Sequence, residues 1–184
     1  MAVVSQPTEP AFPDIRFAKI AQNPPVPAVQ DDTTFFDAGP VTIGVEYRFL
    51  NEEILTAVYG TERAQGIISK LYGPEAVEQH AGDEGVSIHV FDSATRVEHL
   101  RFDDLDDNRH YHYLRTDGRH AVTYYDEIAN GPYRQWVLRT LRTRIAPMLE
   151  LADQAELAAR IDQDVLDAAL DQVEQLLERL RPAA

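Results

Sequence analysis

The sequence predicts an α+β fold, in which a small antiparallel meander sheet is followed by C-terminal helices and preceded by an extended, proline-rich N-terminal arm. Three observations lead to this prediction. Apolar and polar residues alternate strictly from Val41 to Phe49, which is the pattern of a half-buried strand. Two hairpin patterns follow, and apolar residues recur at helical spacing after Pro132. We therefore divide the chain into an arm (1–40), an α+β domain (41–150) and a C-terminal helical segment (151–184).

Composition limits the classes of function. A chain of 184 residues is long enough for one domain with a hydrophobic core. The net charge of −14 argues against a nucleic-acid partner, because phosphate binding needs a basic face. The chain has no cysteine, which excludes disulfides and thiolate-bound metals. It has no long apolar run and no segment typical of a signal peptide, so we expect a cytoplasmic protein.

The predicted arm contains seven of the eleven prolines. The fixed φ and the missing N–H of proline disfavour regular helix and central strand. Large apolar side chains also occur along this segment, and a plain disordered tail would lack them. The arm therefore either binds a partner protein or packs on its own domain. The residues that we expect to bind a partner are Phe12, Ile15, Phe17, Ile20, Phe35 and Phe36.

Helical and hairpin patterns follow the first strand. Residues 51–73 read as helical, with Asn51 or Thr61 as a candidate cap and with Gly60 and Gly73 as turn signals. A first hairpin turns around residues 92–95. A second turns at Asp117-Gly118, a dipeptide that suits a two-residue type I′ turn.

The stretch "RFDDLDDNRHYHYL" (101–114) is the part of the chain that most resembles a chemical site. A type I′ turn at Asp117-Gly118 would place Leu114 opposite Ala121. Because side chains alternate across a strand, His110 and His112 would then share one face and His120 would lie on the other. The three histidines would not converge, so we expect no metal site and no catalytic residues.

Two alternatives remain open for these histidines. His110 and His112 could bind a metal with a third ligand from another strand, for which His89, Glu98 and His99 are candidates. Glu98 and His89 could meet across the first hairpin as an acid–base pair. We interpret the aspartates of the same stretch as a solvated acidic loop, because they do not fit the spacing of a calcium-binding loop. They are Asp103, Asp104, Asp106 and Asp107.

The C-terminal region predicts helices. Pro132 suits a helix start, Pro147 should kink or end that helix, and Asp162 is a candidate N-cap for the last one. Apolar residues in the last helix are spaced four and three apart, which is the rhythm of a coiled coil. The predicted oligomerisation residues are Leu166, Leu170, Val173, Leu177 and Leu180. The alternative is a single amphipathic helix that folds onto the sheet.

Two stretches also resemble an uncharacterised bacterial domain family. They are "EHLRFDDLDDNRHYHYL" from Glu98 and "WVLRTLRTRIAPMLELA" from Trp136, and the resemblance covers roughly residues 85–180. The family shows a strand ending in Leu-Arg-Phe-Asp, an acidic turn, His-Tyr-His-Tyr, and a helix with a Leu-Arg-Thr-Arg segment. One setting for such a domain is the non-metallated scaffold subunit of the high-affinity uptake nickel–iron hydrogenase.

This resemblance implies a non-catalytic scaffold that forms a homo-oligomer, in that setting a tetramer. It implies the large and small hydrogenase subunits as partners, with no cofactor of its own but menaquinone passing through the assembly. Membrane association, at the inner face, would come only through the assembly. The alternative function is a small-molecule-binding protein or an enzyme that uses the strand face of His110 and His112.

Overall fold

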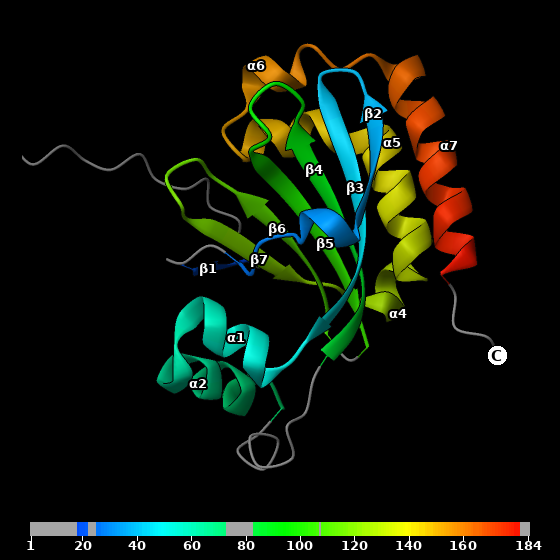
Figure 1. Cartoon of the computed structure of the whole chain (residues 1–184). Helices are drawn as coiled ribbons and strands as arrows, with labels where there is room; N and C mark the ends of the chain where they lie inside the picture. The colour runs from blue at the N-terminus through cyan, green and yellow to red at the C-terminus, as the bar shows by residue number, and fades with distance from the viewer. Residues whose placement is uncertain (1–17, 22–24, 73–82, 107, 181–184) are drawn as a thin grey trace, which may run out of the picture.

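The computed structural model describes residues 18–21, 25–72, 83–106 and 108–180. They form an antiparallel sheet of seven strands in the order β1-β7-β6-β5-β4-β3-β2 (Figure 1). Strands β2 to β7 are a meander, and β1 adds to the outer edge of β7. The strands are β1 (Ala18–Ala21), β2 (Thr33–Ala38), β3 (Val41–Leu50), β4 (Asp83–Asp92), β5 (Glu98–Leu105), β6 (Arg109–Leu114) and β7 (His120–Tyr124).

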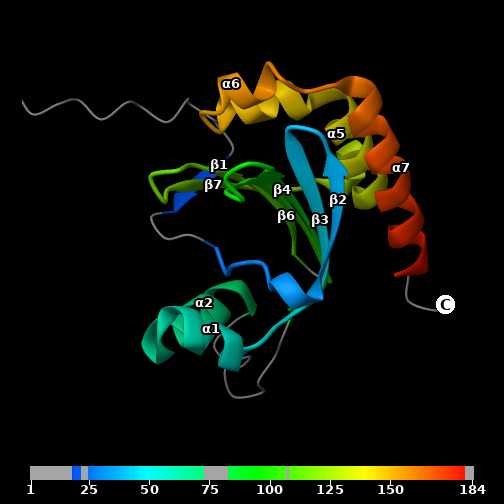
Figure 2. The same cartoon turned by 45° about the horizontal axis from the view of Figure 1, so that its top comes forward.

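Helices lie on both sides of this sheet, as Figures 1 and 2 show. The long helices α5 and α7 cover one face, and α1 and α2 lie on the other side. The predicted α+β class, with a meander sheet followed by C-terminal helices, is confirmed. The helices are η1 (Gln30–Asp32), α1 (Glu52–Tyr59), α2 (Thr61–Tyr72), α4 (Glu127–Asn130), α5 (Tyr133–Leu151), α6 (Ala155–Ala158) and α7 (Gln163–Arg179).

Several local predictions are confirmed. Asn51 caps α1 by accepting the Ile54 N–H at 3.0 Å, and the side chain of Asp162 caps α7. Pro132 directly precedes α5. Pro147 does not end this helix, because α5 continues to Leu151, and the alternative that Pro147 kinks the helix stays a prediction.

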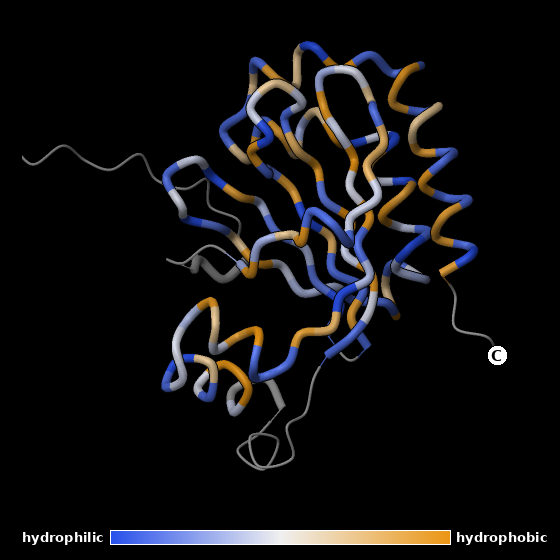
Figure 3. Tube along the Cα trace, viewed as in Figure 1, coloured by the Kyte–Doolittle hydropathy of each residue, from blue (hydrophilic) through white to orange (hydrophobic). Residues whose placement is uncertain are grey.

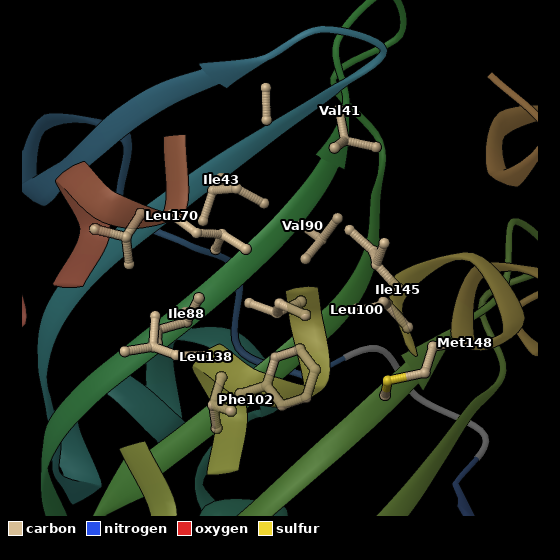
Figure 4. Packing of buried hydrophobic residues seen from close by; sticks show 14 of the residues in the cluster. Val41, Ile43, Ile88, Val90, Leu100, Phe102, Leu138, Ile145, Met148 and Leu170 are labelled. Carbon is tan, nitrogen blue, oxygen red and sulfur yellow. The ribbon is translucent and has the colours of Figure 1, made fainter. Parts of the chain in front are cut away.

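The main hydrophobic core fills the space between the sheet and α5 and α7 (Figure 4). Alternate residues of β3, such as Val41 and Ile43, point into it with Val90 of β4 and Phe102 of β5, each fully buried. The core extends from Ala38 to residues of the last helix, and so crosses the predicted boundaries at residues 40 and 150. A smaller cluster joins Val26 to α1 and α2.

The apolar seam of α7 packs inside its own protomer, against α5, β2 and β3. Polar and apolar residues alternate along this helix (Figure 3), and the apolar side is buried in the core. The structure thus shows the packing of the amphipathic alternative, and a role of these side chains in joining protomers stays a prediction. Leu166, Leu170, Val173 and Leu177 are buried, and Leu180 packs at the edge of the core.

The later part of the predicted arm belongs to the sheet. Phe35 and Phe36 lie in β2, where Phe36 packs against the core and Phe35 contacts the ring of Phe91 at a centroid distance of 5.9 Å. Ile20 lies in β1. Phe12, Ile15 and Phe17 lie outside the described residues, so their predicted role as partner-binding residues stays a prediction.

The β6–β7 hairpin differs from its prediction by one residue. Gly118 N–H donates to Arg115 O at 3.1 Å, and Arg115 N–H donates to Arg119 O at 3.0 Å. With Gly118 at φ +85°, residues 116–118 form a three-residue loop rather than a type I′ turn. Leu114 therefore pairs with His120, and the shift moves every side chain of β7 to the face opposite to the predicted one.

Among the described residues, no helix combines the length and the apolar character needed to cross a membrane.

Candidate metal centre

The sheet face turned away from α5 and α7 carries a layer of buried polar side chains. Strand alternation places them there, because their neighbours along each strand face the hydrophobic core. One row crosses the strands through the pairs Glu46–Ser87, Ser87–Asp103 and Asp103–His110. The next row pairs His89 with Arg101 and Arg101 with His112.

Asp103, His110 and His112 meet within this layer. Oδ2 of Asp103 lies 3.0 Å from Nε2 of His112 and 3.3 Å from Nε2 of His110. One ligand atom from each of the three residues lies within 4.8 Å of the others. The other carboxylate oxygen of Asp103, Oδ1, accepts the hydroxyl of Ser87. Two adjacent strands thus bring a carboxylate and two imidazoles to one point.

A hydrogen bond to the backbone orients the ring of His110, so that Nε2 faces the Asp103 carboxylate. Nδ1 lies 2.7 Å from the backbone oxygen of Asn108, which only accepts, so Nδ1 carries a proton. Nε2 then directs a lone pair at the Asp103 carboxylate unless a cation lies between them, either a second proton or a metal ion. A backbone carbonyl on the second ring nitrogen is the usual support of a metal-bound histidine.

Burial sets the charges of the other two residues. Desolvation lowers the pKa of His112 to about 3, although its hydrogen bond with Asp103 acts in the opposite direction. Burial alone would raise the pKa of Asp103, but the hydrogen bond from His112 and the neighbouring His110 and Arg101 bring it well below its usual range. Because His112 is neutral at neutral pH, it acts on Asp103 through this hydrogen bond. An ionised carboxylate and a neutral imidazole are the forms that bind metals.

The site is almost closed to solvent. The side chains of Asp103 and His112 are 5% and 6% exposed, and that of His110 is 12% exposed. His110 is therefore the residue on the open side of the cluster. Its position on β6 is fixed from the opposite face, where the Tyr133 hydroxyl of α5 donates to the His110 backbone oxygen.

A second buried network lies beside this cluster. His89 is fully buried between two carboxylates, with Nδ1 2.6 Å from Glu98 and Nε2 3.2 Å from Glu46. Glu98 also binds Arg101 through two hydrogen bonds. Both ring nitrogens of His89 thus face carboxylates, so this pair is a structural network and not an open acid–base site. The predicted meeting of Glu98 with His89 is confirmed.

Two buried arginines link this network to the segment before β2. Arg101 donates to Val26 O at 2.7 Å. Arg48 donates to Val26 O and Pro27 O at 3.0 and 2.9 Å. Residues 26 and 27 therefore cover the polar layer through backbone carbonyls, which satisfy guanidinium donors that would otherwise be buried without a partner.

The structure corrects three predictions about this region. His120 lies on the same face as His112, with a ring-centroid distance of 5.1 Å, so the prediction that these histidines diverge is wrong. His99 lies outside the cluster. Asp103, predicted in a solvated loop, is a buried strand residue, and Asp104 is bound by Arg109 and Arg134. Of that acidic run Asp106 is exposed as predicted, and Asp107 lies outside the described residues.

Asp103 could not be found from local sequence. Nothing in the run Asp103-Asp104 marks one carboxylate as buried and the other as ion-paired at the surface. The pairing of β5 with β6 decides this, since it puts Asp103 opposite His110. The His-x-His pattern was the only local signal of the site.

Comparison with curated proteins and with solved structures finds no match. A family model does match: it covers residues 35–177, which include most of β2, the other strands of the meander, the histidine cluster and most of α7. The chain therefore belongs to the family described as domain of unknown function DUF7700.

Proposed function

We propose that this protein is a metal-dependent small-molecule-binding protein, in which Asp103, His110 and His112 hold a divalent first-row transition-metal ion. The observation that supports this most directly is that a buried carboxylate and two imidazoles each present one ligand atom within 4.8 Å of the others. The proposal develops the alternative function predicted for the His110 and His112 strand face, with Asp103 in place of His99.

Two of the spacings between the ligand atoms, those measured from Asp103, are compatible with a metal ion. Bonds of about 2.0 to 2.2 Å to imidazole and carboxylate place neighbouring ligand atoms roughly 3.0 to 3.4 Å apart. The two distances from Asp103 Oδ2 to the imidazoles, 3.0 and 3.3 Å, fall in this range. The donor set of two histidines and one carboxylate suits iron(II), zinc or manganese rather than calcium or magnesium.

Three protein ligands would leave coordination positions for a small ligand or water. When bound, the ion would supply Lewis-acid polarisation, or redox chemistry if it is iron. The protein residues would orient it: Ser87 holds one oxygen of Asp103, and the Asn108 carbonyl holds the ring of His110. The low exposure of the cluster would exclude bulk water, and entry would be on the side of His110.

Metal binding can be tested directly. Protein purified without an affinity tag is stripped with a chelator and titrated with cobalt(II), whose visible absorption reports a protein site with nitrogen and oxygen ligands. We expect a saturable signal at one ion per chain, and elemental analysis should find a first-row metal in the untreated protein. His110→Ala should abolish the cobalt(II) signal while the melting temperature of the chelator-treated protein changes little, because His110 is the most exposed ligand.

His99→Gln is the matched control. His99 is a buried histidine of β5, the strand that carries Asp103, and it was the third ligand of the sequence-based alternative. This variant should keep the cobalt(II) signal. Equal loss in both variants, or no saturable cobalt(II) binding in the unaltered protein, would contradict the proposal.

The scaffold function implied by the family resemblance stays a prediction. The α7 seam no longer supports it, because that seam is buried within the protomer. It now depends on the first residues of the chain, which lie outside the described part. Co-purification of the untagged chain with hydrogenase subunits would test it independently of metal content.

A further inference from the structure

A groove of about 600 Å³ opens on the helix side of the sheet, on the face opposite the histidine cluster. Strand β6 contributes Tyr111 and Tyr113 to its wall, and α5 contributes Trp136, Arg139, Thr143 and Arg144. Its volume is within the range of roughly 300 to 1,000 Å³ that is usual for small-molecule sites. The groove and the proposed metal centre share strand β6 but use opposite sides of it.

Aromatic rings form one wall of the groove. Tyr111 lies 5.2 Å from Trp136 and 5.8 Å from Tyr113 between ring centroids. The three rings are tilted or edge-on to one another, at the centroid spacing that aromatic contacts favour. Trp136 also contacts the rings of Phe102 and Tyr133, so this wall is part of a packed aromatic cluster. Burial raises the pKa of both tyrosines, so their hydroxyls stay protonated and can donate hydrogen bonds.

The charge of the groove contrasts with that of the chain. Helix α5 carries other arginines that are already paired: Arg134 binds Asp104, and Arg142 binds Asp167 and Asp171. Within the described residues, Arg139 and Arg144 form no ion pair, and both are exposed. Two unpaired guanidinium groups at one groove, in a chain of net charge −14, favour an anionic ligand there, and guanidinium groups match carboxylates in geometry.

We propose that this groove binds a planar aromatic carboxylate. The ring of the ligand contacts Tyr111 and Trp136, and its carboxylate is bound by Arg139 and Arg144. The aromatic wall gives affinity for the ring, while the arginine pair selects the anion over a neutral compound of the same shape. Thr143 contributes little to this selection, because its hydroxyl already donates to Arg139 O at 2.8 Å.

The single tryptophan of the chain provides a specific probe. Because there is one tryptophan, its indole N–H gives one isolated signal in a nitrogen–proton correlation spectrum. Trp136 lines the groove, so this signal reports on ligand binding there. The protein is titrated with 2-naphthoate and, separately, with 2-naphthamide. We expect a saturable shift of the indole signal with the carboxylate and at least tenfold weaker binding of the amide.

Two variants distinguish binding by the groove arginines from a general effect of the charge of the protein. The double substitution Arg139→Gln with Arg144→Gln should weaken 2-naphthoate binding at least tenfold and leave amide binding unchanged. Arg63→Gln removes a positive charge from α2, on the other side of the sheet (Figure 2), and should leave both affinities unchanged. Melting curves confirm that each variant is folded. Equal affinity for the carboxylate and the amide, no saturable shift, or equal weakening by Arg63→Gln would overturn the proposal.

Discussion

Oδ2 of Asp103 on β5 lies 3.0 Å from Nε2 of His112 on β6, and both side chains are almost completely buried. A carboxylate in this position needs its hydrogen bonds, because an ionised group buried without partners is strongly destabilising. The contact therefore contributes to folding whether or not a metal is bound. The same carboxylate oxygen also lies 3.3 Å from Nε2 of His110, the third residue of the proposed metal centre.

Asp103→Asn should destabilise the protein and abolish metal binding. The amide has the size of the carboxylate, but Ser87 and His112 lose an ionised acceptor, and hydrogen bonds to charged groups are worth about 1.5 to 3 kcal/mol. We expect a loss of this order in the free energy of unfolding, measured by urea denaturation of the chelator-treated protein. Asp106→Asn, at the exposed residue after β5, is the control. A stable Asp103→Asn protein that still binds cobalt(II) would argue against both roles of this carboxylate.

Glu98 makes stability depend on acid pH. Burial would raise its pKa, but Arg101 and the hydrogen bond from His89 lower it from 4.5 to about 2. A folded-state pKa below the unfolded value means that the stabilisation is present above pH 4.5 and is lost as the pH falls from there toward 2. The full difference corresponds to roughly 3 kcal/mol, as an order of magnitude.

The Glu98→Gln variant tests this dependence. Its free energy of unfolding should be lower at neutral pH and should vary less between pH 4.5 and 2 than that of the unaltered protein. Glu156→Gln, at an exposed position of α6, should leave the pH dependence unchanged. Parallel pH profiles for the Glu98→Gln variant and the unaltered protein would show that another group carries the acid transition.

Elements with strong local patterns could be predicted from the sequence, and their pairing could not. Strand β3 follows from its alternation, and α1 and α7 follow from their caps, Asn51 and Asp162. The face of His120 was wrong because Asp-Gly suits both a two-residue turn and the loop of residues 116–118 that the structure shows. These two turns differ by one residue in register, and no local signal decides between them.

The four-three spacing of α7 shows a second limit of sequence reasoning. A seam of leucines fits a coiled coil and an amphipathic helix on a sheet equally well over so short a length. What decides is the sheet: β2 and β3 present Ala38, Ile43 and Val45 to this helix side of the molecule. That surface depends on the contacts between distant segments, which periodicity does not reveal.

Leu177→Asp should lower the melting temperature without changing the mass of the particle. Leu177 is buried in the core of its own chain, so the substitution would place a charge among apolar side chains, and such changes are among the most destabilising known. Differential scanning calorimetry together with light scattering measures both quantities. Gln175→Asp, exposed on the same helix, should have little effect on either. A dissociated but stable Leu177→Asp protein would instead restore the coiled-coil interpretation.

A chain that begins at Val41 should fold poorly, although the proline content of residues 1–40 predicts a separable arm. The truncation removes β2, which pairs with β3 from Thr33 to Ala38 and packs under α7. It also removes the carbonyls of Val26 and Pro27, which accept hydrogen bonds from Arg48 and Arg101 and cover the polar layer; hydrogen bonds to charged groups are worth about 1.5 to 3 kcal/mol each. A chain that begins at Pro25 keeps both features and is the matched comparison.

Circular dichroism melts should show a much lower melting temperature, or no cooperative transition, for the chain from Val41 than for the chain from Pro25. Equal melting temperatures would mean that β2 and the covering carbonyls contribute nothing measurable, and the segment would then be an arm as the sequence predicts.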